Sequence, residues 1–356
     1  SVIGTLTGAR TTPEAPELQA RLAELVTDGV TDVAMEVSSH ALVLGRVDAV
    51  EFAVGIFTNL GADHLDFHGN VEQYFAAKAR LFEAGRCRAA VVNVDDVHGR
   101  LLVDAATGDG PEMVGVSVDD VRDLRLHPDG STFTWRGHPV RLPLPGRHNV
   151  SNALLVAEAG VLLGLDPAEV AAALGTVGVV PGRFELVDEG QPFTAAVDYA
   201  HTPDALRAVL TAARESADGL LLVVFGCGGD RDRGKRPEMG RVVHELADVA
   251  ILTTDNPRSE DPAAIAAEVV AGLPSGALVE AGGTFVQVPD RAAAIREAAA
   301  AAGPGDVVVV AGKGHETTQV VGDVVTEFDD RLVLAEALRG LGYGNAGSDR
   351  SPGGPE

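Results

Sequence analysis

The stretch Thr58–Phe82, TNLGADHLDFHGNVEQYFAAKARLF, combines a polar turn with a helix-like pattern and directs the interpretation of the first half of the chain. The turn follows an apolar, strand-like run, Val54–Phe57, and contains two aspartates and two histidines. These residues are Asp63, His64, Asp66 and His68. Carboxylates and imidazoles bind metals and carry protons, so this strand end is a candidate site for either chemistry.

A helix is predicted after the turn, because Asn70 and Gln73 resemble a capping box and large apolar residues recur at helical spacing. These apolar residues are Val71, Tyr74, Phe75, Leu81 and Phe82. Lys78 lies on the same stripe. Its stem can lie along the apolar surface with the ammonium in water. Alternatively, a lysine shielded from solvent has a lowered pKa, and its neutral amine can capture carbon dioxide as a carbamate, an anionic metal ligand.

The composition excludes several classes of protein. With 356 residues, 46% of them apolar, the chain is long enough for two domains. Its formal net charge of -24 argues against a nucleic-acid or anionic-membrane surface, since both require a basic footprint. Cys87 and Cys227 are too few for a disulfide framework. No apolar run approaches a membrane span and no signal peptide is visible, so we expect a soluble, cytoplasmic protein.

The N-terminal residues predict an element order of strand, helix, strand. The chain begins in a strand-like run, Ser1–Gly8, without an initiator methionine, and we interpret it as a fragment. Thr11 and Thr12 precede a helix and are expected to cap it, although their hydroxyls are also suited to a polar ligand. The apolar stripe of that helix is Leu18, Leu22, Leu25 and Val26.

A buried strand is predicted over Val33–Val37, with Glu36 in its interior and Ser38, Ser39 and His40 at its end. A carboxylate inside a buried strand is costly unless it is paired or bound to a metal. Glu36 is therefore a candidate ligand.

Two polar strand ends, Glu36–His40 and Asn59–His68, followed by a helical lysine, are more specific together than any one of them alone. With this combination the sequence resembles the Mur ligase superfamily, from Ser1 to about Tyr343. Within it, the chain is most similar to the branch that adds the third residue to UDP-N-acetylmuramoyl-L-alanyl-D-glutamate.

The resemblance implies that Glu36, His64 and a carbamylated Lys78 are the catalytic residues and bind Mg²⁺. It also implies contacts to the UDP-N-acetylmuramoyl dipeptide from Thr11, Thr12, Ser38 and Arg46. Leu44 departs from the family pattern, because a polar substrate contact is expected there.

The rest of the first half predicts a buried strand at Ala89–Val94 and a small antiparallel sheet within Met113–Leu144. A long helix is expected to begin at Gly146–Asn152 and to run through Leu165. Asn149 is suited to cap it. The resemblance instead implies that Asn149 and Asn152 face the adenine of ATP, and Asn152, one turn into the helix, is hard to explain as a cap.

After a Val/Gly/Pro-rich connector near Val180, the chain alternates strands and helices, which predicts a mostly parallel, doubly wound α/β sheet. The predicted strands are Thr194–Val197, Leu220–Phe225, Val249–Thr253 and Val307–Val310. Polar clusters follow them directly: Asp198–His201, Gly226–Arg231, Asp255–Arg258 and Gly312–Glu316. Each alone is typical of a solvated turn. Ligands of open α/β sheets bind at the carboxyl ends of strands, so four clusters on one edge predict a binding site.

Gly229–Arg236 is close to a phosphate-binding loop, but Arg236 replaces the hydroxyl residue and Pro237 follows, so we reject it as a nucleotide loop. The resembled family places such a loop shortly before the point where this chain starts. We therefore expect the given chain to lack that loop and the uridine-binding domain, and to show little ATP-dependent ligation by itself.

The expected domains are residues 1–180, a Mur-type central domain, and residues 181–345, a Rossmann-like C-terminal domain, with a disordered tail at 346–356. The resemblance implies that ATP converts the D-glutamyl carboxylate to an acyl phosphate, which the amine of an amino acid then attacks. It also implies that Arg183, Asp198 and His201 face ATP or the hinge between the domains.

The amino acid implied by the resemblance is meso-diaminopimelate rather than L-lysine, because Asp255-Asn256-Pro257-Arg258 matches the diaminopimelate signature. A guanidinium at Arg258 suits the distal carboxylate. A surface pairing of Arg258 with Glu260 or Asp261 is the alternative. The other diaminopimelate contacts that the resemblance implies are Arg231, Asp255, Asn256, Gly312 and Glu316.

Three other functions remain open at this point. A sister ligase of the folylpolyglutamate synthetase type would share the ATP and metal residues. A metal-dependent hydrolase would use Asp63, His64, Asp66 and His68 directly. A truncated chain would bind substrate without catalysis. In every case we expect small-molecule partners, and we expect a monomer.

Overall fold

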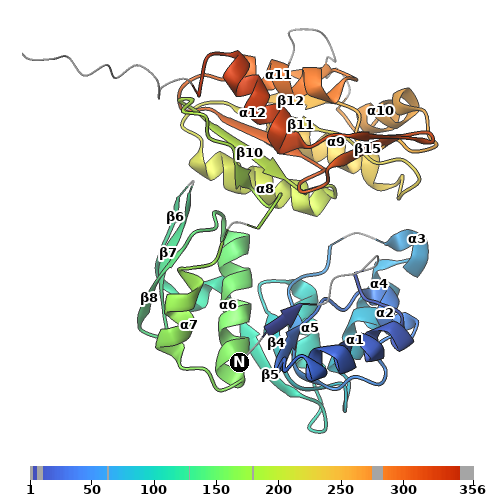
Figure 1. The fold of residues 1–356 in the computed structure, drawn as a ribbon, viewed down its shortest axis with the longest axis vertical. Coiled ribbons are helices and arrows are strands. Elements are labelled where there is room, and N and C mark those ends of the chain that lie inside the picture. Colours follow the sequence, from blue (N-terminus) through green and yellow to red (C-terminus); the bar gives the residue numbers. More distant parts are fainter. Residues whose placement is uncertain are drawn as a thin grey trace, which may run out of the picture.

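The structure, a computed structural model, describes residues 3–5, 11–61, 64–127, 129–178, 180–274 and 284–344, with the side chains of residues 3–5 and 66 left out of the description. Two regions lie at opposite ends of the longest axis of the molecule (Figure 1). The first region runs from β1 to α7 and the second from β9 to α12. The predicted tail, residues 346–356, lies outside the described residues.

The first region contains a parallel three-stranded sheet of order β3-β4-β5 and a parallel pair, β1-β2. Its strands are β1 (Ile3–Thr5), β2 (Asp32–Ala34), β3 (Phe52–Phe57), β4 (Cys87–Asn93) and β5 (Glu112–Val116). Its helices up to β5 are α1 (Ala15–Thr27), α2 (Ser39–Val43), α3 (Leu65–His68), α4 (Val71–Ala79), η1 (Arg80–Phe82) and α5 (Val97–Asp104). The predicted helix after the polar turn is confirmed as α4 and η1, and the Asn70 side chain caps α4 by accepting from the Gln73 amide.

Two predictions about the N-terminal elements are wrong. The strand around Glu36 is β2, which ends at Ala34 and is exposed throughout, so Glu36 is an exposed residue beyond the strand. The apolar pattern instead reflects Met35 and Val37, which pack against the buried cluster that contains Leu18. Thr12 does not cap α1, whose N-cap is Glu14.

A three-stranded antiparallel sheet and two helices complete the first region. Its elements are η2 (Val118–Asp120), β6 (Arg122–His127), β7 (Gly130–Trp135), β8 (His138–Leu142), α6 (Arg147–Leu162) and α7 (Pro167–Leu174). The predicted antiparallel excursion is confirmed, but it begins at Arg122, because β5 still pairs in parallel with β4. Trp135 and Leu154 lie in the core between this sheet and α6.

The second region is a six-stranded sheet of order β13-β12-β11-β14-β10-β9, in which only β9 is antiparallel to its neighbour. The strands are β9 (Glu185–Leu186), β10 (Thr194–Asp198), β11 (Leu221–Phe225), β12 (Val249–Leu252), β13 (Phe285–Gln287) and β14 (Val307–Ala311). The helices are α8 (Pro203–Ser216), α9 (Lys235–Leu246), α10 (Pro262–Val270), α11 (Arg291–Ala301) and α12 (Asp330–Gly340). The prediction of a mostly parallel α/β sheet is confirmed.

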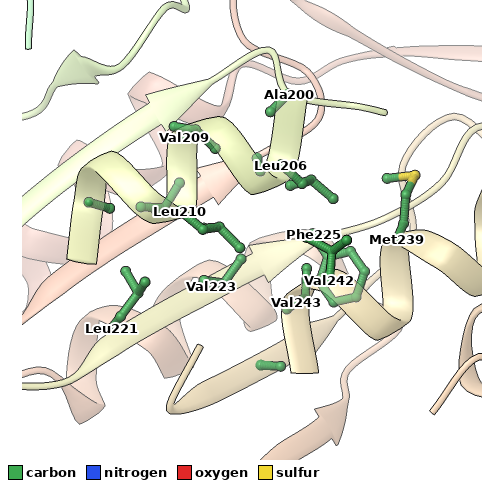
Figure 2. Close-up of a cluster of buried hydrophobic side chains, with 14 of the residues drawn as sticks. Ala200, Leu206, Val209, Leu210, Leu221, Val223, Phe225, Met239, Val242 and Val243 are labelled. Atoms are coloured by element: carbon green, nitrogen blue, oxygen red, sulfur yellow. The ribbon is translucent and has the colours of Figure 1, made fainter. Parts of the chain in front are cut away.

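Helices cover both faces of this sheet, because its central strands are apolar on both sides. On β11, Val223 and Phe225 join the core under α8, α9 and α10, whereas Leu222 and Val224 face the core under α11 and α12. This alternation follows the two-residue period of a strand. Figure 2 shows the first of these cores, with Leu206 and Leu210 of α8 and Met239 of α9 over β11.

A two-stranded hairpin, β15 (Thr318–Val321) and β16 (Val324–Glu327), follows β14, and a bridge joins its Val321 to Arg258 in the segment after β12. Among the helices in the described ranges, none is long and apolar enough to cross a membrane. Because β10, β11, β12 and β14 run parallel, their carboxyl ends lie at the same edge of the sheet. The hairpin covers part of that edge.

Candidate active site

Two loops at the carboxyl edge of the six-stranded sheet are joined by side chains. The β12 turn, Asp255–Arg258, follows β12, and the β14 loop, Gly312–Glu316, follows β14. Asn256 Nδ2 donates to Glu316 Oε2 at 2.9 Å. The sequence prediction placed both residues at one amino-acid site, and the structure brings them into contact.

A fully buried lysine, Lys313, holds these two loops together. Its ammonium donates to Asn256 Oδ1 at 3.3 Å, Glu316 Oε2 at 3.5 Å and the Thr318 carbonyl at 2.5 Å. Three acceptors satisfy the three donors of an ammonium, which offsets the cost of burying its charge. Lys313 lies inside the predicted polar cluster Gly312–Glu316, but no role for it is predicted from the sequence. The signal that points to it is a lysine between two glycines, directly after an all-apolar strand.

Arg258 has a constrained backbone at the end of the β12 turn. Its φ is +52°, in the left-handed region that costs a non-glycine residue about 1 kcal/mol or more. The hairpin holds it there, because the Arg258 amide donates to the Val320 carbonyl at 3.1 Å and its carbonyl accepts from the Gly322 amide at 2.7 Å.

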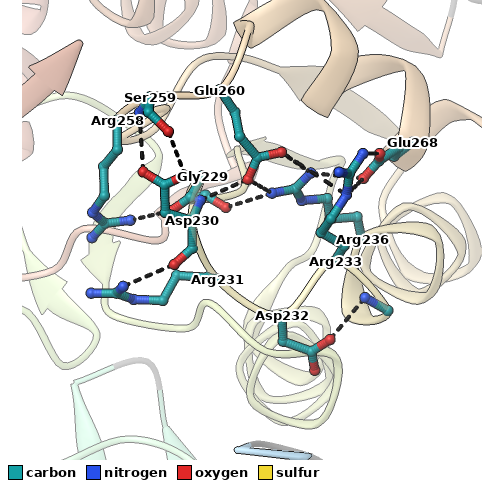
Figure 3. Close-up of polar contacts among 12 residues, drawn as sticks. Gly229, Asp230, Arg231, Asp232, Arg233, Arg236, Arg258, Ser259, Glu260 and Glu268 are labelled. Carbon is teal, nitrogen blue, oxygen red and sulfur yellow. Dashed lines mark hydrogen bonds and ion pairs between the residues drawn. The ribbon is translucent and has the colours of Figure 1, made fainter. Parts of the chain in front are cut away.

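The Arg258 guanidinium points to the neighbouring β11 loop, Gly226–Arg231, where Nη1 donates to the Gly229 carbonyl at 2.7 Å (Figure 3). The alternative surface pairing is wrong: Glu260 pairs with Arg236, and Asp261 caps α10. Arg231 lies beside Arg258 in the same view and bonds to the Asp230 carbonyl at 2.9 Å. A Cβ on Gly228 would lie 3.1 Å from Arg258 Nη1, 3.8 Å from the Asn256 carbonyl oxygen and 3.9 Å from Arg231 Cγ, so both arginines lie near the Asn256 backbone.

Asp255 and Gly312 complete this part of the edge. Asp255 is buried, and a Cβ on Gly312 would lie only 2.7 Å from Asp255 Oδ2. With a φ of +119°, Gly312 adopts a conformation that disfavours any side chain. Glycine at 312 therefore lets the β14 loop approach the Asp255 carboxylate.

The ATP candidates of the second region lie at the end of β10. The Asp198 carboxylate is buried and accepts from the Phe184 amide at 2.8 Å and the Ala200 amide at 2.7 Å. Arg183 lies over the Tyr199 ring at 4.9 Å, and His201 Nδ1 is 2.7 Å from the Tyr199 carbonyl oxygen. Asp198 thus orients the segments that carry Arg183 and His201.

The ATP candidates of the first region lie at the start of α6. The expected cap is wrong: Gly146 is the N-cap residue, and Asn149 Nδ2 donates to the Pro145 carbonyl at 2.8 Å. Asn152 is exposed on the same helix. This helix end faces the second region, because a Cβ on Gly146 would lie 3.1 Å from Ala212 Cβ of α8, and Asp198 and Arg183 are close enough to act electrostatically on His148.

A cluster of aromatic rings surrounds the metal candidates of the first region. The His64 ring lies 5.0 Å from that of His40 and 6.0 Å from that of Tyr74, and Lys78 Nζ lies 5.2 Å from the Tyr74 centroid. His68 stacks on Tyr74 and its Nε2 is 2.9 Å from Ser39 Oγ. His64 itself has a φ of +56°, a strained conformation that is common at functional sites.

His64 and Lys78 therefore both lie near the Tyr74 ring, and their role as metal ligands stays a prediction. Glu36 is exposed on a separate segment, and its carbonyl accepts from the Thr12 hydroxyl at 3.0 Å. Within the described ranges, no group of three or more His, Cys, Asp or Glu side chains is arranged to hold a metal ion. Asp63 and the Asp66 side chain lie outside the described residues, so the hydrolase hypothesis that used them stays untested.

The donor set nevertheless suits Mg²⁺ in type. The Glu36 carboxylate and a carbamate on Lys78 offer oxygen ligands, which Mg²⁺ prefers, and His64 offers one imidazole. Lys78 is half-buried, and its Nζ lies over the Tyr74 ring.

The candidates for the nucleotide-sugar peptide form a second polar group in the first region. Thr12 is buried, and its hydroxyl accepts from the Ser38 amide at 3.0 Å. Arg46 Nη1 donates to the Thr12 carbonyl at 3.2 Å and Nη2 pairs with Glu14 at 2.8 Å. Thr11 is exposed beside them, and Leu44 is 56% exposed.

Comparison with known proteins gives matches over both regions. Residues 1–160 match the Mur ligase middle domain, and residues 182–314 match the glutamate ligase domain of Mur ligases. The chain is 50% identical over 343 residues to the UDP-N-acetylmuramoyl-L-alanyl-D-glutamate--2,6-diaminopimelate ligase of Streptomyces coelicolor, covering 93% of this chain and 67% of that protein.

The ligase of the same description from Solibacter usitatus is 45% identical over 351 residues, covering 95% of this chain and 69% of that protein. A solved structure of a UDP-N-acetylmuramoyl-L-alanyl-D-glutamate--2,6-diaminopimelate ligase superposes with a TM-score of 0.62 at 36% identity, covering 94% of this chain and 69% of that one.

Proposed function

The chain belongs to the Mur ligase family, and from that premise we propose that it is an ATP-dependent ligase that joins meso-diaminopimelate to UDP-N-acetylmuramoyl-L-alanyl-D-glutamate. This reaction belongs to peptidoglycan precursor synthesis. The single observation that supports the choice of amino acid is the joined pair of loops at the sheet edge, where Asn256 of the β12 turn, which also carries Arg258, binds Glu316.

The charges of this edge match the distal end of diaminopimelate. Diaminopimelate differs from L-lysine by one carboxylate on the distal carbon, and Arg258 and Arg231 offer forked donors for such a group. Glu316 offers an acceptor for the distal ammonium. Lysine would leave the guanidinium groups without a carboxylate, which is the kind of mismatch that discriminates between substrates.

The reaction proceeds through an acyl phosphate. ATP transfers its terminal phosphoryl group to the D-glutamyl carboxylate and leaves as ADP, and the amine of diaminopimelate then attacks the acyl carbon and expels phosphate. When bound by Glu36, His64 and carbamylated Lys78, Mg²⁺ would offset the charge on the transferring group.

The remaining candidates bind and orient the substrates. Thr11, Thr12, Ser38 and Arg46 would hold the nucleotide-sugar peptide. Asn149 and Asn152 from the first region would face the adenine, and Arg183 and His201 would approach ATP from the second region. Asp198 would keep those two residues in place through its two backbone hydrogen bonds. Closure of the two regions around ATP would then assemble the site. We further propose that the protein acts in the cytoplasm as a monomer.

The test is ligation by the full-length protein with each amino acid. We expect diaminopimelate to be used in preference to L-lysine, and Arg258→Ala to reduce that preference by roughly 2 kcal/mol, about 30-fold, because one side of a charge-assisted pair is lost. Arg241→Ala, which removes an exposed guanidinium paired with Glu238 on α9, is the matched control and should leave the preference unchanged. Equal use of L-lysine by the unmutated protein would defeat the proposal.

A further inference from the structure

A network of ion pairs lies behind the two guanidinium groups of the amino-acid site, and its centre is Arg236 on α9. Arg236 is fully buried, although it is one of the largest side chains in the protein. Its Nη2 donates to Glu260 Oε1 at 2.7 Å and to the Gly228 carbonyl at 3.2 Å, and its Nη1 donates to Glu260 Oε2 at 2.9 Å. One planar guanidinium thus touches both the β11 loop and the residues just after the β12 turn.

Glu260 passes this contact on to the β11 loop. Its Oε1 also accepts from the Asp230 amide at 2.6 Å, and the Asp230 carboxylate accepts from the Ser259 amide at 3.1 Å and the Ser259 hydroxyl at 2.7 Å (Figure 3). The hydrogen bond to Arg236 is the largest cause that lowers the pKa of Glu260 to about 2, so the carboxylate is ionised throughout the physiological range.

The network supports strained backbone on both loops. Asp230 and Arg258 have φ values of +53° and +52°, and neither is a glycine. Such conformations persist only where surrounding contacts determine them. Arg258 carries one of the guanidinium groups proposed to bind the distal carboxylate of the amino acid. Asp230 is next to Arg231, which carries the other.

We propose that Arg236 and Glu260 are positioning residues for the amino-acid site, and that they set the separation and direction of the Arg231 and Arg258 guanidinium groups. The inference rests on the proposed function, since it concerns the same site. A purely structural role is the competing explanation, because Arg236 also joins α9 to α10 through Glu268, with Nη1 2.7 Å from Oε2.

The chain offers a matched pair of variants that separates these two roles. Glu260→Gln and Glu268→Gln each remove one carboxylate partner of Arg236, and both carboxylates are partly exposed. Only Glu260 touches the β11 loop. We expect Glu260→Gln to raise the KM for diaminopimelate about 10-fold, with the KM for ATP unchanged, because small misplacements of binding groups weaken binding strongly. Glu268→Gln should leave both values unchanged.

The sign of the effect excludes a simple charge explanation. Removing a negative charge near Arg231 and Arg258 would strengthen their attraction for a carboxylate and lower the KM. Arg236→Lys, which keeps the charge but cannot serve two loops with a forked group, should behave as Glu260→Gln does.

A second measurement needs no substrate. Amide hydrogen exchange on this chain should accelerate at Asp230 and Ser259 in Glu260→Gln but not in Glu268→Gln, since only the former loosens the contact between the loops. If Glu260→Gln folds poorly, Ser259→Ala loosens the same two loops by removing the hydroxyl bond to the Asp230 carboxylate, and it should accelerate exchange at Asp230.

Three results would overturn the inference: equal rises in KM for the two glutamine variants, no rise in either, or unchanged exchange at Asp230 and Ser259. If the unmutated protein fails to prefer diaminopimelate over L-lysine, the proposed function fails instead, and the exchange measurement still decides whether Arg236 and Glu260 hold the loops.

Discussion

The two candidate sites of this protein are built in opposite ways. At the sheet edge of the second region, the candidate side chains are bonded to one another: Asn256 to Glu316, Lys313 to both, and Arg258 to the β11 loop. In the first region, His64 and Lys78 lie near one tyrosine ring, and Glu36 is exposed on a separate segment.

This difference indicates how each site becomes competent. Buried charges must be paired by the protein itself, so the site of the second region is formed before a substrate binds. The same pairing makes this region less tolerant of substitutions. Partly exposed ligands can be brought together by the ion and substrates that they bind. Substitutions of buried, paired residues in the second region should therefore disturb folding, whereas substitutions of the candidate ligands in the first should disturb chemistry.

The largest expected effect on stability comes from the buried pair Arg291–Asp330. Both side chains are fully buried, their closest atoms are 2.7 Å apart, and Arg291 also donates to the Ala311 carbonyl at the end of β14. Asp330→Asn should lower the free energy of unfolding by about 3–5 kcal/mol, because it leaves a buried charge without its partner. Denaturant unfolding measures this, with Glu36→Gln in the first region expected to stay within about 0.5 kcal/mol.

A double variant sharpens this prediction. Arg291→Met combined with Asp330→Asn should recover part of the loss, since the unpaired charge is then gone. Breaking the exposed pair Arg339–Glu189 with Arg339→Met should cost at most about 1 kcal/mol. If the Asp330→Asn protein were as stable as the unmutated one, the proposed difference between the two regions in tolerance to substitution would be wrong.

The second prediction concerns chemistry in the first region. Lys78→Ala should lower ligation by the full-length protein by about 100-fold or more, because an anionic ligand near the transferring phosphoryl group is lost. Unfolding should change little, since Lys78 is only half-buried. Added small carboxylate anions should restore part of the activity, and bicarbonate should produce a carbamate detectable by carbon-13 NMR in the unmutated protein.

Arg88→Ala removes an exposed cation from β4 and serves as the control, with no expected loss of ligation. Full activity in Lys78→Ala would show that the lysine stem simply covers apolar surface.

The sequence predicted the second region well, because its signals are local. Five-residue apolar strands such as β11 and β14 ended at polar clusters, and parallel pairing alone then brought Asn256 and Glu316 to one edge. The sequence did not predict the pairing partners at that edge. Lys313 and Arg236 bind residues that are distant in the chain, and hydrophobic periodicity carries no information about such pairs.

Predictions in the first region failed where apolar residues packed outside regular strands. Met35 and Val37 gave Glu36 the surroundings of a strand interior, but both side chains pack on the Leu18 cluster after β2 has ended. Thr12 had the residue type of a helix cap, yet its hydroxyl bonds to Glu36 and Ser38, because the chain returns beside it after α1. Tertiary contacts replaced the local role in both cases.

The third prediction tests how strongly ionisation stabilises the second region. The hydrogen bond from Arg236, followed by that from the Asp230 amide, lowers the pKa of Glu260 from its ordinary value of 4.5 to about 2. A carboxylate with a lowered folded pKa contributes stability above its unfolded pKa and loses it as the pH falls through the folded value. The shift corresponds to at most about 3 kcal/mol, and screening of this partly exposed group reduces it to roughly 1–2 kcal/mol.

The unmutated protein should therefore be more stable than Glu260→Gln above about pH 5, with the advantage shrinking as the pH falls toward 2. Urea unfolding of the two proteins across this range measures the difference. An advantage that persisted unchanged at pH 2 would mean that packing, not ionisation, is what Glu260 contributes.

The smallest expected effect is the change in KM caused by Gly228→Ala. The same substitution at the adjacent Gly229 gives the contrast. A Cβ on Gly229 would lie 1.8 Å from the Pro257 carbonyl oxygen, so Gly229→Ala must displace backbone and should destabilise the second region.

A Cβ on Gly228 would lie 3.1 Å from Arg258 Nη1, the far end of a flexible side chain. Gly228→Ala should therefore leave unfolding almost unchanged but move the guanidinium, raising the KM for diaminopimelate by roughly two- to fivefold, equivalent to under about 1 kcal/mol. The KM for ATP should not change. If Gly228→Ala left the KM for diaminopimelate unaltered while Arg258→Ala raised it, that result would mean that the guanidinium tolerates displacement. The amino-acid site of the second region would then be less pre-formed than its hydrogen bonds indicate.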